Sequence, residues 1–121
     1  MGKFLLCRVS SGFKFNLLAA NGQVIATSEV YGSAAACRKG AESVRSCAAT
    51  APVEDLTEPG AKVPHPKFQL YQDKAGRFRF RLRSRNGKII AASEGYATRS
   101  GCENGIQSLR DNAPAAQVEG P

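Results

Sequence analysis

The chain contains one sequence pattern twice, and this repeat limits the possible folds more than any other feature. Residues 13–48 and 78–113 align without a gap at an offset of 65, with fifteen identical positions among thirty-six. The shared positions include Phe13/Phe78, Phe15/Phe80, Leu17/Leu82, Asn21-Gly22/Asn86-Gly87, Ser28-Glu29/Ser93-Glu94, Tyr31/Tyr96, Cys37/Cys102, Gly40/Gly105 and Arg45/Arg110. A repeated unit of this size buries its apolar face against its copy, and 121 residues suffice for one good core. We therefore expect both repeats to share a single core.

Each repeat has the pattern of three strands, one helix and a final strand. Alternating apolar residues predict the first two strands, as at Phe78, Phe80 and Leu82. Asn21-Gly22 and Asn86-Gly87 predict type I′ hairpin turns, which need positive φ at both central residues. Third strands follow at 24–26 and 89–91, and short final strands at 53–56 and 116–119.

The helix of each repeat is indicated by an N-cap residue and an apolar stripe. Ser33 and Thr98 are suitable N-caps, and apolar residues recur three or four positions apart after each of them. Gly40 and Gly105 lie inside these helices, where glycine costs about 1 kcal/mol relative to alanine. Because the cost occurs twice at one place, we expect a close backbone approach there, either of the helix to the sheet or of one helix to the other.

These elements predict an α+β fold in which two tandem β-β-β-α-β repeats share one antiparallel sheet, with the helices on one face. Repeat 1 spans residues 1–57 and repeat 2 spans 67–121. Residues 58–66, rich in proline and glycine, form a semi-rigid linker, so the chain is one pseudo-symmetric domain.

The composition predicts a cytoplasmic protein without a membrane span. No apolar stretch approaches the roughly 20 residues that a spanning helix needs. The apolar run that ends at Cys7 is shorter than a signal-peptide core of about 7–15 residues. The four cysteines, Cys7, Cys37, Cys47 and Cys102, lack metal-ligand spacing and are expected to be small thiols, mostly buried.

Three runs in repeat 2 resemble the YegP-like family, small bacterial and archaeal proteins classed as a domain of unknown function. They are Phe78-Arg79-Phe80-Arg81-Leu82, the run from Asn86-Gly87-Lys88 to Tyr96, and the run from Cys102-Glu103-Asn104 to Arg110. The resemblance implies that the two repeats exchange their C-terminal strands, so that the chain is a monomer containing an intramolecular pseudo-dimer. It brings no established activity, cofactor or catalytic residue. Repeat 1 departs from the pattern, with Val30 in place of glycine and Arg38-Lys39 in place of Glu-Asn.

Positive charge is concentrated in repeat 2. Residues 1–60 carry six Lys/Arg and five Asp/Glu, whereas residues 61–121 carry eleven and five. Five arginines occupy every second position along the second predicted strand of repeat 2 and at its two ends: Arg77, Arg79, Arg81, Arg83 and Arg85. Because the alternate Phe and Leu side chains face the core, at least Arg79, Arg81 and Arg83 should project from the open face of the sheet. Guanidinium groups suit bidentate contacts with phosphate, so this row is a candidate site for nucleic acid or another polyanion.

Other interpretations of the arginine row remain open. The arginines could form a solvated sheet face that resists aggregation, or acids on neighbouring strands could neutralise them. The second function class is a structural or protein-interaction module that uses Leu5, Cys7 and Leu18 on the repeat-1 half of the same face.

Catalysis is the least supported class. His65, the single histidine, lies between two prolines without an evident base or nucleophile partner. No acid spacing typical of a metal site and no glycine-rich phosphate loop is present. The repeated Ser-Glu and Tyr positions at the strand-to-helix junctions are interpreted as structural. The sequence therefore favours a binding protein without a cofactor or a metal.

Overall fold

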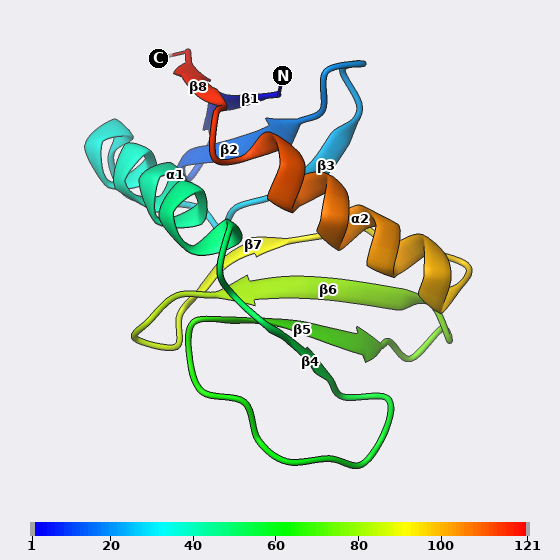
Figure 1. Cartoon of the computed structure of the whole chain (residues 1–121). Helices are drawn as coiled ribbons and strands as arrows, with labels where there is room; N and C mark the ends of the chain where they lie inside the picture. Colours follow the sequence, from blue (N-terminus) through cyan, green and yellow to red (C-terminus); the bar gives the residue numbers. More distant parts are fainter. Residues whose placement is uncertain (1, 121) are drawn as a thin grey trace.

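The computed structural model describes residues 2–120, which form an eight-stranded sheet and two helices (Figure 1). Repeat 1 contains β1 (Lys3–Val9), β2 (Gly12–Leu18), β3 (Val24–Thr27), α1 (Ala34–Ala48) and β4 (Val53–Asp55). Repeat 2 contains β5 (Lys67–Gln72), β6 (Phe78–Arg83), β7 (Ile89–Ala92), α2 (Arg99–Asn112) and β8 (Gln117–Glu119). The predicted α+β fold of two β-β-β-α-β repeats is confirmed.

The final strand of each repeat lies in the other repeat's half of the sheet. The strand order is β4-β5-β6-β7-β3-β2-β1-β8, so β4 pairs with β5 and β8 pairs with β1 (Figure 1). The exchange that the family resemblance implied is therefore present. Both exchanged strands run parallel to their neighbours, so the sheet is mixed rather than antiparallel throughout. Parallel pairing is possible because helices and loops, not tight turns, separate the paired strands.

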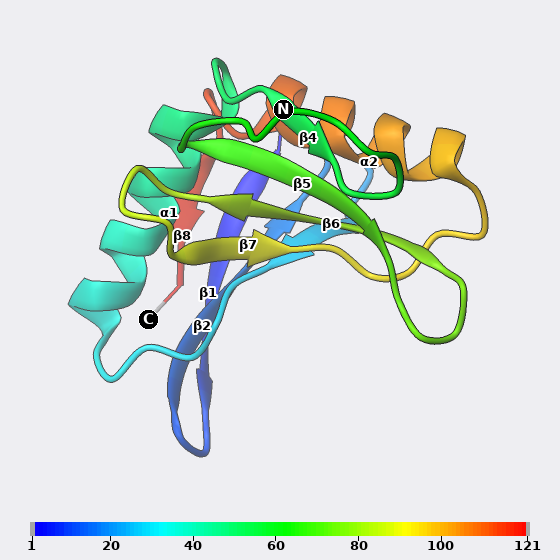
Figure 2. The same ribbon diagram turned by 90° about the horizontal axis from the view of Figure 1, so that it is seen from below.

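Both helices lie on one face of the sheet and leave the other face open (Figure 2). Each helix packs on the first two strands of its own repeat and on the third strand of the other: α1 contacts β7, and α2 contacts β3. Ser33 and Thr98 cap the helices as predicted, each accepting a hydrogen bond from a first-turn N–H. The helices thereby tie the two halves into one core.

Aromatic pairs at equivalent positions fill this core. Phe4 and Phe15 meet edge to face at 5.4 Å between ring centroids, and Phe68 and Phe80 do so at 6.1 Å. All four rings are fully buried. The stretch of alternating apolar residues in each hairpin therefore predicted the inward face correctly.

The hairpin turns differ from the predicted type I′. Gly22 and Gly87 have φ of 86° and 85°, but no residue other than glycine among residues 2–120 has positive φ. The Gly22 N–H donates to the Ala19 carbonyl while the Ala19 N–H donates to Gln23. This pattern is a three-residue loop, in which a type I turn is followed by one left-handed glycine. Both hairpins form as predicted, but each loop has one residue more than a type I′ turn. A register shift follows directly after the loop, in the pairing of β2 with β3 and of β6 with β7.

Neither helix in the described residues 2–120 has the length and apolarity to cross a membrane. Cys37, Cys47 and Cys102 are buried free thiols, and Cys7 is half-buried. The cysteines thus pack as small apolar side chains, as expected.

Candidate polyanion-binding face

The alternation of β6 directs its arginines away from the core. Phe80 and Leu82 are fully buried under the helices. Arg79, Arg81 and Arg83 lie on the open face, half-buried among their neighbours, while Arg77 and Arg85 flank the strand and are exposed. The five arginines thus lie along one strand, but their partners differ.

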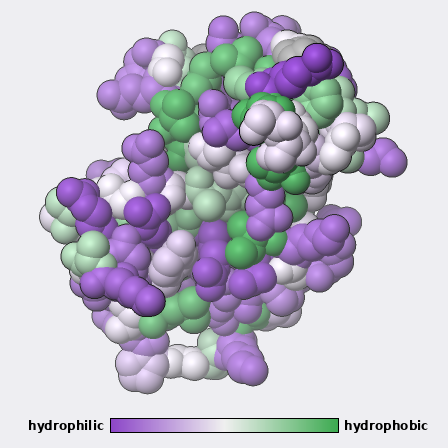
Figure 3. Space-filling model, turned by 180° about the vertical axis from the view of Figure 1, so that it is seen from behind, coloured by the Kyte–Doolittle hydropathy of each residue, from purple (hydrophilic) through white to green (hydrophobic). Residues whose placement is uncertain are grey.

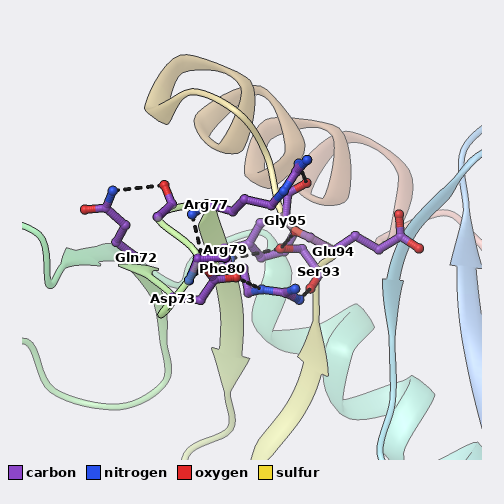
Figure 4. A network of polar contacts seen from close by, with 10 residues as sticks. Gln72, Asp73, Arg77, Arg79, Phe80, Ser93, Glu94 and Gly95 are labelled. Atoms are coloured by element: carbon purple, nitrogen blue, oxygen red, sulfur yellow. Dashed lines mark hydrogen bonds and ion pairs between the residues drawn. The ribbon is translucent and has the colours of Figure 1, made fainter.

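Arg79 is neutralised by an acid. Its Nε lies 2.7 Å from Oδ2 of Asp73, in the turn between β5 and β6 (Figure 4). The Arg79 guanidinium is the first cause that holds the pKa of Asp73 below its ordinary value, and backbone N–H groups of the turn add to it. The Arg77 side chain donates to the Gly95 carbonyl at 3.4 Å, while its backbone N–H donates to Asp73 Oδ1 at 3.0 Å. The interpretation that neighbouring acids neutralise the arginines is therefore correct for Arg79.

Arg81 and Arg83 converge instead on one neutral oxygen. Their Nε–H groups donate to the same Gln69 Oε1, at 2.7 Å and 2.6 Å. Arg83 also donates to the Gly87 carbonyl, and the Arg81 guanidinium lies 4.6 Å from the centre of the Tyr71 ring. Within residues 2–120, neither guanidinium forms an ion pair with a carboxylate. We name this arrangement, Arg81 and Arg83 on Gln69, the arginine pair.

A buried ion pair fixes the orientation of Gln69. Its Nε2 donates to Oε1 of Glu54 on the exchanged strand β4, at 2.8 Å. Glu54 also accepts from the Val63 N–H and pairs with Lys67 Nζ at 2.9 Å. The hydrogen bond from Gln69, followed by those from Val63 and Lys67, lowers the pKa of Glu54 to about 2. Since the amide nitrogen is held by Glu54, the amide oxygen must face the arginines.

The lowered pKa predicts how Glu54 affects stability in acid. A carboxyl group with a folded-state pKa of about 2 and an ordinary value of 4.5 stabilises the fold fully above about pH 4.5 and loses this contribution as the pH falls toward 2. We expect Glu54→Gln to melt at a lower temperature than the wild type at pH 6, with the difference shrinking as the pH falls toward 2.5. Thermal melts followed by circular dichroism measure this difference. Glu103→Gln, at an exposed site on α2, should retain the wild-type profile; a constant gap for Glu54→Gln would contradict the assignment.

Repeat 1 has kept the supporting pair but not the arginines. Lys3 pairs with Glu119 of β8 at 3.5 Å, as Lys67 pairs with Glu54. By sheet register, Leu5 occupies the position of Gln69, and Asn16 and Leu18 those of Arg81 and Arg83. The open face is therefore basic in one half and more apolar in the other. Figure 3 views this face, where hydrophilic side chains surround an interrupted apolar band.

Among the remaining sequence candidates, the two repeated serines have structural roles. Ser93 Oγ accepts from the Phe80 N–H and donates to the Glu94 carbonyl, and Ser28 does the same in repeat 1. The Glu94 carboxylate points away from the polar network (Figure 4). His65 lies beside Gly87, next to the turn. Within residues 2–120, no three His, Cys, Asp or Glu side chains gather closely enough to hold a metal ion.

Three members of the site were not singled out from the sequence: Gln69, Glu54 and Lys67. Alternation alone placed Gln69 and Lys67 on the open face, but polar residues there are ordinary. Glu54 reaches them only because β4 crosses to the other repeat, with Glu54 opposite Gln69. That register depends on the whole fold and has no local signal.

Comparisons with known proteins match the chain along both repeats. The family model "Domain of unknown function (DUF1508)" matches residues 10–55 and 73–119. A UPF0339 protein of Methanosarcina acetivorans is 56% identical over 52 residues, which are 43% of this chain and 90% of that protein. The UPF0339 protein YegP of Escherichia coli O157:H7 is 36% identical over 122 residues, covering 98% of this chain and 96% of the relative.

A solved structure supports the fold over almost the full length. The solution structure of the protein of unknown function YegP from E. coli superposes with a TM-score of 0.80 at 33% identity. The match covers 98% of this chain and 90% of that one. The relative from Methanosarcina corresponds to one repeat, so the same unit also occurs singly.

Proposed function

This chain belongs to the DUF1508 family, a domain of unknown function, and we propose that it binds polyanions, chiefly the phosphate backbone of nucleic acids, through the arginine pair. The observation that carries the proposal is the convergence of Arg81 and Arg83 on the single oxygen of Gln69. The two guanidinium groups repel each other, and the neutral oxygen that they share does not offset this repulsion. A phosphate that bridges them would relieve the repulsion and use the guanidinium N–H groups that do not contact Gln69.

The surroundings of the arginine pair add to this field. Lys67 lies directly opposite Arg83 across the β5–β6 ladder, where like charges are unfavourable. Among residues 2–120, Glu54 is the one acid that pairs with Lys67, and Arg81 and Arg83 reach it only through the Gln69 amide. The side chains are also preorganised, because Gln69 is held from behind by Glu54. The entropy cost of ordering these side chains is therefore incurred on folding and not when an anion binds.

The arrangement favours backbone contacts over base-specific recognition. Sheet surfaces that recognise bases usually offer open aromatic rings. Here the β6 phenylalanines face the core, and the Tyr71 ring is partly covered by Arg81. We accordingly assign no catalytic residue, and the protein acts by binding.

Fluorescence anisotropy with labelled single-stranded oligonucleotides across a salt series tests this function. We expect Arg81→Ser with Arg83→Ser to weaken binding about tenfold or more at low salt and to reduce the salt slope by about one to two units, since each phosphate contact contributes about 0.7 to the slope for a single strand. The control is Arg8→Ser with Lys39→Ser, which removes the same charge from exposed positions in repeat 1. Equal losses in both double variants would mean that only net charge matters.

A protein-interaction role is the alternative, and one observation favours it. Leu5, Cys7 and Leu18 replace Gln69, Tyr71 and Arg83 in the repeat-1 half and are half-buried on an open face. If this half docks a protein, Leu5→Lys or Leu18→Lys should weaken that contact and leave oligonucleotide binding and its salt dependence unchanged.

A further inference from the structure

A hollow of about 720 Å³ lies between the linker and the open face, next to the arginine pair. Leu56, Val63 and Pro64 form an apolar wall on the linker side. Lys67, Gln69 and Arg83 line the sheet side. Figure 1 shows the linker running from the end of β4 back to the start of β5 along this edge of the sheet. The volume falls within the range of about 300–1,000 Å³ that is usual for small-molecule sites.

The charges of the hollow favour an anionic occupant. Lys62, Lys67 and Arg83 line it, against the single carboxylate of Glu54. That carboxylate is already engaged by Lys67, Gln69 and the Val63 N–H. Arg83 belongs both to the hollow and to the arginine pair, so an anion on the pair lies at the mouth of the hollow. The body of the occupant would then lie along the apolar wall.

We propose that this hollow receives one nucleoside monophosphate unit, with its phosphate on Arg81 and Arg83 and its base against the wall of Leu56, Val63 and Pro64. The inference rests on the proposed function and names the ligand class at the same site. A base in a duplex is paired and stacked, so it cannot enter the hollow without being flipped out. The site therefore prefers unpaired nucleotides, supplied either by a single strand or as free nucleotides.

Three fluorescent probes of equal length test the inference: decathymidylate, an abasic strand with the same phosphates, and a duplex. We expect the wild type to bind decathymidylate about tenfold more tightly than the abasic strand, because the base buries apolar surface against the aliphatic wall of the hollow, and more tightly than the duplex. Leu56→Glu places a carboxylate in the hollow at a side chain that is 46% exposed, and it should abolish this preference. Val24→Glu, at a 44% exposed position lining a different hollow, should retain it.

A competition experiment distinguishes free nucleotides from a single strand as the source of the bound unit. Displacement of decathymidylate by thymidine monophosphate would identify free nucleotides as ligands, and a persistent preference without displacement would identify the strand. Equal affinity of the wild type for decathymidylate and the abasic strand would overturn this inference while leaving backbone binding intact. Absence of binding to every probe at low salt would overturn the proposed function as well, so the two failures are distinct.

Discussion

Replacing Arg110 by alanine is expected to destabilise the fold by about 3 kcal/mol. Arg110 on α2 donates to the carbonyl of Ala51 at 2.6 Å, and its guanidinium lies 5.2 Å from the centre of the Phe68 ring. Ala51 is buried just before the exchanged strand β4. Truncation leaves that carbonyl without its partner, which costs about 1–3 kcal/mol, and removes a cation–π contact worth about 0.5–2 kcal/mol.

Arg45, the equivalent residue of repeat 1, makes the corresponding contacts with the segment that leads into β8. From α1 it donates to the carbonyl of Ala116, just before β8, and its guanidinium lies over Phe4. The two arginines thus join each helix to the segment that enters its own half from the other repeat. Urea unfolding should show a comparable loss for Arg45→Ala. Lys39→Ala, an exposed site on α1, should change stability by less than about 0.5 kcal/mol; losses that small for both arginines would contradict this role.

Gly105→Ala should also destabilise the protein, by about 1–2 kcal/mol, although alanine is the better helix former. A Cβ at position 105 would overlap the hydroxyl of Tyr96, lie 2.8 Å from its Cζ and 3.0 Å from Cε2 of Phe80. Tyr96 stacks on Phe80 at 6.4 Å between centroids, so its ring cannot swing away freely. Overpacking of this kind costs about 1–3 kcal/mol, which exceeds the gain of about 1 kcal/mol in helix propensity.

A double-mutant cycle with Tyr96→Phe separates the two effects. Removal of the hydroxyl relieves the worst overlap, so Gly105→Ala should be less harmful in the Tyr96→Phe background. Gly32→Ala, where no atom lies within 4 Å of an added Cβ, should be nearly neutral. Stabilisation by Gly105→Ala in the wild-type background would show that the helix is not closely approached there.

Local patterns predicted the elements because each has a local physical cause. The alternation of Phe78, Phe80 and Leu82 identified the inward face of β6, and Ser33 and Thr98 marked the helix starts. The glycines at 40 and 105 predicted a close approach, which is confirmed, but the neighbour is a tyrosine side chain. The turn type was wrong, because Asn-Gly also suits a loop in which only the glycine has positive φ.

The candidate site was predictable only in part. Alternation placed Arg79, Arg81 and Arg83 on one face, yet it gave no means of separating Arg79, which Asp73 neutralises, from the arginine pair. That distinction depends on residues of the β5–β6 turn and of β4. The roles of Arg45 and Arg110 were equally hidden, since their identity in both repeats was the single signal and their partners lie across the exchange.

The most direct test of the central claim is an NMR titration that follows the Arg side-chain Nε–H signals as a short oligonucleotide is added at low salt. We expect the signals of Arg81 and Arg83 to shift together and to saturate at the same concentration, because both groups would hold one phosphate beside Gln69. The Arg79 signal should move less, since Asp73 remains its partner. Binding that leaves the Arg81 and Arg83 signals in place, or no binding at all, would contradict the assignment of the arginine pair as the anion site.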